Sequence, residues 1–172
     1  MLKKSACACL VVLLAIGLCA CSVDGEGHFL YREQGFCAEV RGRMRENEFT
    51  AVVGLTPTDG GYRVEVGYLS PATLEGLEVS AECDVGGKPC TNGRLFWEGH
   101  ESDVDAETLA GLLLPACVLL GNAEIVSVRY EGAIRHLTLS NGITLCLGED
   151  GMPQSLQSEA IFFDVIWSEL KK

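Results

Sequence analysis

The feature that most constrains the fold of this chain is a series of short segments in which apolar and polar residues alternate. In the first segment, Phe36, Ala38 and Val40 alternate with Glu39 and Arg41. A period of two is typical of antiparallel strands with one buried and one solvated face. Similar segments, separated by turn residues, follow at 49–55, 62–68, 77–81, 94–98, 124–130, 133–139, 143–147, 154–158 and 160–168. We therefore expect a meander of about ten strands.

The strongest turn signal in the chain is Asn141-Gly142, between the alternating segments 137–139 and 143–145. Asparagine followed by glycine readily adopts the positive φ angles of a two-residue hairpin turn. The sequence therefore predicts a hairpin at this position.

One segment, residues 103–121, interrupts the strands with leucines at helical spacing. Pro115 lies inside this segment and should kink or split the helix, because proline has no amide hydrogen. The helix is either ordinary core against the sheet or a lid over an apolar cavity. The predicted fold is mainly β (α+β), a curved antiparallel sheet or incomplete β-barrel of about ten strands with one bent helix packed on its concave face.

The first 20 residues are predicted to be an export signal, because Lys3 and Lys4 precede an apolar run too short to span a membrane comfortably. The run ends in Leu18-Cys19-Ala20-Cys21, which resembles the lipobox of bacterial lipoproteins, so Cys21 is the expected site of lipidation by palmitate or a similar acyl chain. Plain secretion after a small residue is the alternative. We expect a signal peptide at 1–20, a lipidated cysteine and tether at 21–35, and a single domain at 36–172, held outside the cytoplasm on the bacterial cell membrane.

Charge and motif content exclude several functions. A net charge of -11 argues against nucleic acid as a partner, which needs a basic footprint. The histidines His28, His100 and His136 show no spacing to a nucleophile, and no metal-binding or phosphate-loop motif is present. We expect no enzyme activity, metal or cofactor; a hydrolase would need His100 or His136 to meet carboxylates in a polar cleft.

Five cysteines follow the predicted anchor: Cys37, Cys83, Cys90, Cys117 and Cys146. Outside the cytoplasm, disulfides persist. Cys83 and Cys90 enclose a turn-rich loop whose ends can meet, which makes them the preferred disulfide pair. Buried free thiols are the alternative.

The basic residues Arg41, Arg43 and Arg45 are spaced by two, and so lie on one face of a strand or its extension. They are expected either to pair with Glu39 and Glu65 or to contact an acidic partner or a phospholipid head group.

Several segments together resemble a known family. They are the lipobox, the strand Phe36-Cys37-Ala38-Glu39-Val40, residues 68–77 (YLSPATLEGL), the turn at 148–153 (GEDGMP) and the closing aromatic strand at 161–167. Their order is similar to that of the LolA-like superfamily of outer-membrane lipoprotein carriers, which includes the GerS-like germination lipoproteins of Firmicutes. The resemblance implies an incomplete antiparallel barrel and a non-catalytic role.

The role that the resemblance implies is to bind a hydrophobic or acylated ligand in a cavity between sheet and helix. The alternative is a tethered scaffold or regulator that docks an envelope or spore enzyme and has no lipid cavity. In the first case, the cavity is expected to be lined by Leu109, Leu112, Leu113, Leu120, Val64, Val66, Ile161 and Phe163. The expected partners are the membrane, through the anchor, and a lipid or an envelope protein.

Overall fold

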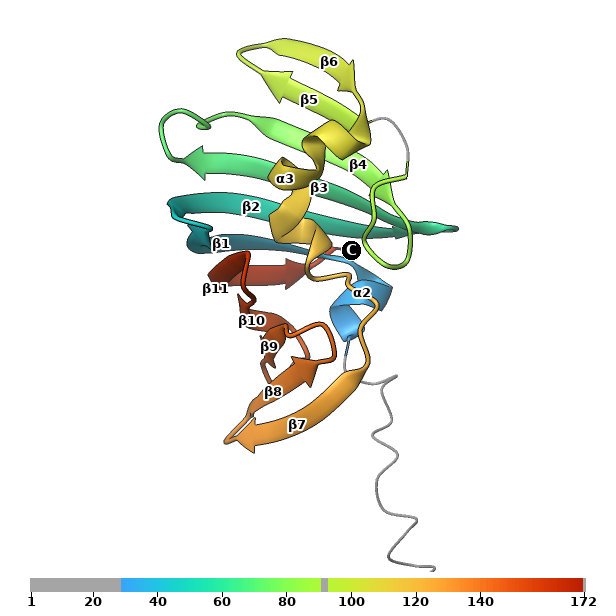
Figure 1. Cartoon of the computed structure of the whole chain (residues 1–172), viewed down its shortest axis with the longest axis vertical. Coiled ribbons are helices and arrows are strands. Elements are labelled where there is room, and N and C mark those ends of the chain that lie inside the picture. Colours follow the sequence, from blue (N-terminus) through green and yellow to red (C-terminus); the bar gives the residue numbers. More distant parts are fainter. Residues whose placement is uncertain (1–28, 91–92, 172) are drawn as a thin grey trace, which may run out of the picture.

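The computed structural model describes residues 29–90 and 93–171. In this part of the chain, eleven strands form one antiparallel sheet, and two helices accompany it (Figure 1). The elements in chain order are α2 (Leu30–Gln34), β1 (Phe36–Met44), β2 (Asn47–Thr58), β3 (Gly61–Ser70), β4 (Glu78–Cys83), β5 (Gly93–Trp97), β6 (His100–Val104), α3 (Ala106–Cys117), β7 (Ile125–Glu131), β8 (Ile134–Leu139), β9 (Thr144–Leu147), β10 (Pro153–Gln157) and β11 (Ile161–Leu170).

The sheet is centred on the first and last strands of the chain. Its order is β6-β5-β4-β3-β2-β1-β11-β10-β9-β8-β7, and β1 pairs with β11 from Phe36 opposite Leu170 to Met44 opposite Ile161. The two edges, β6 and β7, are consecutive in the chain, so the connection that contains α3 crosses from one half of the sheet to the other (Figure 1). β6 and β7 do not pair with each other, and the sheet is therefore open.

This architecture confirms the predicted mainly-β fold with a helix on an antiparallel sheet. The predicted hairpin is also present, because β8 and β9 pair around Asn141 and Gly142. Gly142 has φ 81°, and its amide donates to the carbonyl of Leu139 over 3.0 Å. Positive φ at this position requires the glycine.

One strand is not predicted by the sequence. β6 (His100–Val104) has the sequence HESDV, which lacks apolar alternation because the strand is an exposed edge paired only to β5. The expected helix start at residue 103 is therefore too early. α3 begins after Asp105, whose side-chain oxygen accepts a hydrogen bond from the amide of Glu107 over 2.8 Å.

Pro115, which was expected to kink or split the helix, does not split it. α3 is continuous from Ala106 to Cys117 with Pro115 in its last turn. The carbonyl that loses its helical donor is that of Gly111, which is exposed, so water can satisfy it. Neither helix of the described residues is long and apolar enough to cross a membrane.

The hydrophobic core lies between the sheet and α3, which contacts β2 to β5. The alternation seen in the sequence decides which side chains face it. Phe36, Ala38 and Val40 of β1 are completely buried there, whereas Arg41 and Arg43 face the opposite side of the sheet and are exposed. We call that opposite side the open face, because neither described helix covers it.

The helix α2 lies within the range that the sequence assigns to a tether. Its Tyr31 is completely buried and stacks edge-on against Phe36, with ring centroids 5.4 Å apart. The hydroxyl of Tyr31 and Nε of Arg32 both donate to the carbonyl of Leu119, over 2.8 and 2.9 Å. The carbonyls at the C-terminal end of a helix have no donor within the helix. The side chains of α2 supply these donors, and the same hydrogen bonds hold α2 against the domain.

Candidate functional site

The residues expected to line a lipid cavity form the interior of the domain. Seven of the eight have at most 1% of their surface exposed, namely Leu109, Leu113, Leu120, Val64, Val66, Ile161 and Phe163. Leu112 is partly buried and packs against them. In this conformation, the side chains themselves occupy the space between α3 and the sheet, so a ligand there would require α3 to move.

Two tyrosines hold α3 over the sheet. The hydroxyl of Tyr68, on β3, donates to the carbonyl of Leu112 in the middle of α3 over 2.8 Å. Burial raises the pKa of Tyr68 to about 12 and also raises the pKa of Tyr31, which holds the C-terminal end of α3. Both hydroxyls are therefore protonated donors at neutral pH.

The two edges of the sheet differ in how they are protected. The outermost strand β6 carries Glu101 and Asp103, and charges on an edge discourage pairing with another chain. The other edge, β7, has the sequence IVSVRYE, in which Val126 is 67% exposed and Tyr130 is 66% exposed. β7 pairs with β8 on one side and with no described strand on the other.

Two of the hollows on the open face lie over the central strands. One, of about 520 Å³, lies over β2 to β5 above Gly54 and Gly67, with Phe96 and Lys171 among its lining residues. Lys171 is paired within the chain, because its Nζ donates to a carboxylate oxygen of Glu65 over 2.8 Å. The other hollow, of about 850 Å³, lies at the far end of β1, β2 and β11.

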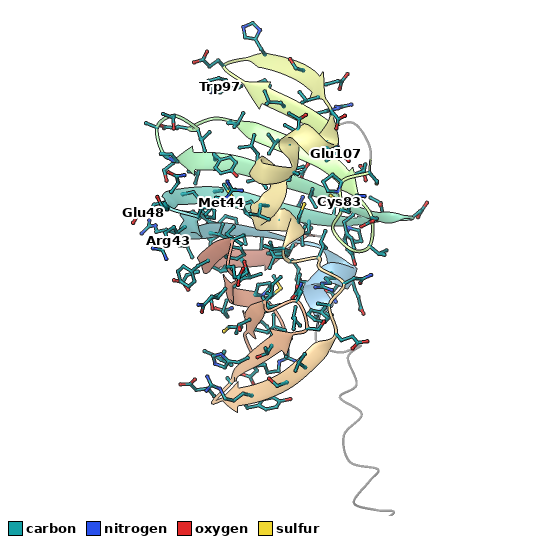
Figure 2. The ribbon with its side chains drawn as sticks, viewed as in Figure 1. Arg43, Met44, Glu48, Cys83, Trp97 and Glu107 are labelled. Atoms are coloured by element: carbon teal, nitrogen blue, oxygen red, sulfur yellow. The ribbon has the colours of Figure 1, made fainter. Side chains whose placement is uncertain are left out.

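The second hollow includes part of the predicted basic cluster. Arg41 and Arg43 line it together with Phe162 and Ile166, whose side chains are 40% and 49% exposed. Figure 2 shows Arg43 near the β1–β2 turn, close to where Glu48 is labelled. The expected ion pairs with Glu39 and Glu65 are not formed: Glu39 accepts from Trp167 Nε1 over 2.9 Å, and Glu65 pairs with Arg63 and Lys171.

The five described cysteines are all free thiols. Cys83 lies close to Cys117, with 3.9 Å between the sulfurs, and not to Cys90. Cys83 is opposite Pro89 in a short antiparallel bridge, which puts Cys90 on the opposite face of the ladder. The thiol of Cys90 is exposed and donates to the carbonyl of Glu82 over 3.5 Å.

A thiol and an imidazole meet on the open face, a contact that sequence reasoning missed. Sγ of Cys146 lies 3.1 Å from Nδ1 of His136, and Nε2 of the same ring lies 3.4 Å from the carboxylate of Glu131. The signal was present in the predicted hairpin, whose register places His136 opposite Cys146. Neither residue lines the two open-face hollows, so the contact does not form a cleft with them.

His100 is exposed at the start of β6, and no described carboxylate is paired with it. Cys21 and His28 lie outside the described residues. Within residues 29–90 and 93–171, no group of three or more histidine, cysteine or acidic side chains is placed to hold a metal ion.

The chain is similar in fold to a protein of known structure. No protein-family model matches the chain, and neither does any curated protein. Among solved structures, the chain is similar to the LolA superfamily protein NE2245 from Nitrosomonas europaea, with a TM-score of 0.42 and 8% sequence identity over 84% of this chain and 89% of that one. The likeness is distant and concerns the fold alone; a GerS-like identity stays a prediction.

Proposed function

We propose that this protein is a non-catalytic docking protein of the bacterial envelope, held on the cell membrane by an acyl chain on Cys21. An extended segment of a partner protein adds to the sheet along β7. The observation that carries this proposal is that β7 is an exposed edge strand with apolar side chains and no charged protection on its first four residues.

An open edge strand offers unpaired backbone amides and carbonyls to any extended chain. Natural proteins usually block such edges with charge, as β6 does here. The β-branched residues Ile125, Val126 and Val128 favour a strand. Ile125 and Val128 pack against the core, so the exposed apolar side chains of β7 are those of Val126 and Tyr130. Ile134 on the neighbouring β8 is also 40% exposed and lies opposite Glu131, at the other end of β7 from Val126. The register of β7 against β8 is irregular between Ile125 and Ser127, so we expect an added strand to pair with the regular part of β7 from Ser127 onward.

We expect the segment that pairs with β7 to belong to a different protein and not to a second copy of this chain. The chain carries a net charge of -11, so two copies repel each other on approach. The only positive charge on β7 is Arg129, which lies 3.9 Å from Glu131 of the same strand. The expected partner segment is therefore extended, rich in β-branched or aromatic residues, and not acidic.

A photo-crosslinking amino acid placed at Val126 in the full, exported chain tests this proposal in the producing bacterium. Val85 is the matched control, because it is 59% exposed in the loop after β4 and is not part of the β7 edge. We expect adducts from position 126, and not from position 85, to an extended segment of one partner protein. A peptide of that segment should bind the wild-type protein and Val85→Lys, but not Val126→Lys.

Three outcomes of the crosslinking would contradict docking at β7. These are adducts of position 126 to a second copy of the chain, adducts to lipid, or adducts no stronger than those of position 85.

A second candidate function is the binding of a hydrophobic or acylated ligand between α3 and the sheet. It is favoured by the apolar underside of α3, which contacts the sheet through residues such as Leu109 and Leu113. Moving α3 and the segment that follows it would expose Leu109, Leu113, Leu119 and Leu120 at a cost of about 6–12 kcal/mol, and burying ten methylenes returns about 8 kcal/mol. Exchange of the helix for an acyl chain is therefore close to balanced.

Native mass spectrometry of the exported protein distinguishes this second candidate. A stoichiometric lipid adduct, identified after solvent extraction, would support ligand binding. A clean mass of the protein alone would contradict it, and would leave docking at β7 as the function to pursue.

A further inference from the structure

Two thiols that are far apart in the sequence lie together under the end of α3. Cys83 is the last residue of β4 and Cys117 is the last residue of α3, and their sulfurs are 3.9 Å apart. Figure 2 shows Cys83 beside the C-terminal half of the helix. A disulfide bond is about 2.05 Å long, so the two sulfurs, already in contact, must approach by about 1.9 Å to form one.

The loop after β4 holds this pair in place. Oδ1 of Asp84 accepts from the amides of Gly86 and Lys88, both over 2.9 Å. Gly87 has φ 78°, and a Cβ there would lie 2.7 Å from the carbonyl oxygen of Cys117. Only glycine permits both the conformation and this close approach. The loop therefore packs tightly against the end of α3, next to the two sulfurs.

We propose that Cys83 and Cys117 form a disulfide that fastens α3 to β4 when the exported chain meets small-molecule disulfides. One thiolate attacks a sulfur of the small disulfide, forms a mixed disulfide and releases one small thiol. The second thiolate then attacks the protein sulfur of the mixed disulfide, forms the Cys83–Cys117 bond and releases the other small thiol. The two protons lost by the cysteines are taken up by the two thiols released.

The hydrogen bond between the thiols favours this exchange. Donation from Cys117 lowers the pKa of Cys83, against an opposing effect of burial. The same hydrogen bond and burial raise the pKa of Cys117. Cys83 is 2% exposed and Cys117 is half-buried, so the small disulfide reaches Cys117 first. Cys83, which more readily becomes a thiolate, then makes the second attack, on the sulfur of Cys117.

The remaining cysteines do not compete for the bond. Cys90 faces away from Cys83, as its contact with the carbonyl of Glu82 shows. Cys37 and Cys146 lie on β1 and β9 with their side chains toward the open face, on the other side of the sheet from α3. A bond between Cys83 and Cys117 therefore leaves these three as thiols.

Peptide mapping of the full exported chain tests the proposal. The protein is incubated under native conditions with glutathione disulfide as the probe, quenched with acid, alkylated and digested. We expect a linked pair of peptides that contain Cys83 and Cys117, with Cys90 alkylated. Recovery of both Cys83 and Cys117 as alkylated thiols, or of a Cys83–Cys90 link, would overturn the proposal.

Variants give a second readout. Oxidation should raise the thermal unfolding midpoint of the wild-type protein and of Cys90→Ser by roughly 5–10 °C, because the bond closes a long loop in the unfolded chain. It should leave the midpoint of Cys117→Ser unchanged. If Cys117→Ser fails to fold, the peptide map of the wild-type protein still decides the question. An equal rise in Cys117→Ser and the wild type would contradict the proposed bond.

Discussion

The hydroxyl of Tyr31 donates a hydrogen bond to the carbonyl of Leu119 over 2.8 Å, and this contact joins the start of the described chain to the end of α3. The two residues are 88 positions apart in the sequence. Arg32 adds a donor to the same carbonyl and a second, over 3.3 Å, to that of Gly121. The segment nearest the predicted anchor is therefore a structural part of the domain.

Replacing Tyr31 with phenylalanine should lower the free energy of unfolding by about 1 kcal/mol, because one buried hydrogen bond is lost while Arg32 still serves the carbonyl. Adding Arg32→Ala should raise the loss to about 2–3 kcal/mol, because the carbonyl then has no donor. Urea denaturation measures both. Tyr130→Phe is the control, since Tyr130 is 66% exposed, and a loss as large in that variant would argue against the capping role.

Alkaline pH should weaken the contact between β3 and α3. Burial raises the pKa of Tyr68 to about 12, whereas an exposed tyrosine titrates near 10. The contribution of this group to stability is complete below pH 10 and is lost as the pH rises toward 12, by about 2–3 kcal/mol.

Tyr68→Phe should remove part of this alkaline loss, and should cost about 1 kcal/mol at pH 7 because the hydrogen bond to Leu112 disappears. Tyr31 contributes in the same direction, because burial also raises its pKa. Denaturation at pH 7 and at several values above pH 10 measures the difference. An identical pH dependence of the variant and the wild type would refute this assignment.

Replacing each of two glycines with alanine should change the stability of the protein in opposite directions. A Cβ on Gly42 would overlap the carbonyl of Phe162 and lie 2.6 Å from Cα of Phe163, both backbone atoms of β11. Gly42→Ala should therefore force the central strands apart and cost about 3 kcal/mol or more. Gly111→Ala, in an exposed position of α3 with open space around it, should stabilise the protein by about 0.5–1 kcal/mol. Equal effects of the two changes would contradict this packing.

The tight packing between α3 and the sheet can be tested by shortening a buried leucine. Leu113 is completely buried, so Leu113→Ala should cost about 2–5 kcal/mol through lost burial and the cavity that remains. Leu69→Ala serves as the control, because Leu69 is 47% exposed on β3. A cost below about 1 kcal/mol for Leu113→Ala would mean that the interior is less filled than the structure has it.

The predicted anchor is tested by the lipid that it carries. Cys21→Ser should no longer incorporate a labelled fatty acid, because the thiol that would carry the acyl group is replaced by a hydroxyl. Cys19→Ser, two residues earlier, should keep the label. Labelling of the producing bacterium followed by immunoprecipitation decides the outcome, and a label retained by Cys21→Ser would exclude lipidation at that residue.

Local patterns in the sequence were sufficient for most of the fold. The alternation of Phe36, Ala38 and Val40 with Glu39 and Arg41 predicted β1 and its buried face, and Asn141-Gly142 predicted the β8–β9 hairpin. The periodicity of the sequence did not predict β6, because this edge strand consists mainly of polar residues and buries neither of its faces. It also gave no sign of α2, whose five residues are too few to show a helical period.

The candidate sites were less predictable because they depend on contacts between distant segments. Cys83 and Cys90 are close in the sequence but face opposite sides of a ladder, whereas Cys117 reaches Cys83 through the docking of α3. The contact of His136 with Cys146 follows from the hairpin register, and the sequence contained enough information to find it.

The sequence by itself determined ten of the eleven described strands and which of their side chains are buried, because both follow from short-range periodicity and the gain from burying apolar surface. It also determined the predicted export and lipidation signal at Cys21. Only the tertiary structure decided that β6 and β7 are the edges, that the leucines of α3 occupy the space above the sheet, and that Cys83 meets Cys117. These features depend on strand order and on helix docking, which are set by the packing of the whole chain and have no local signal.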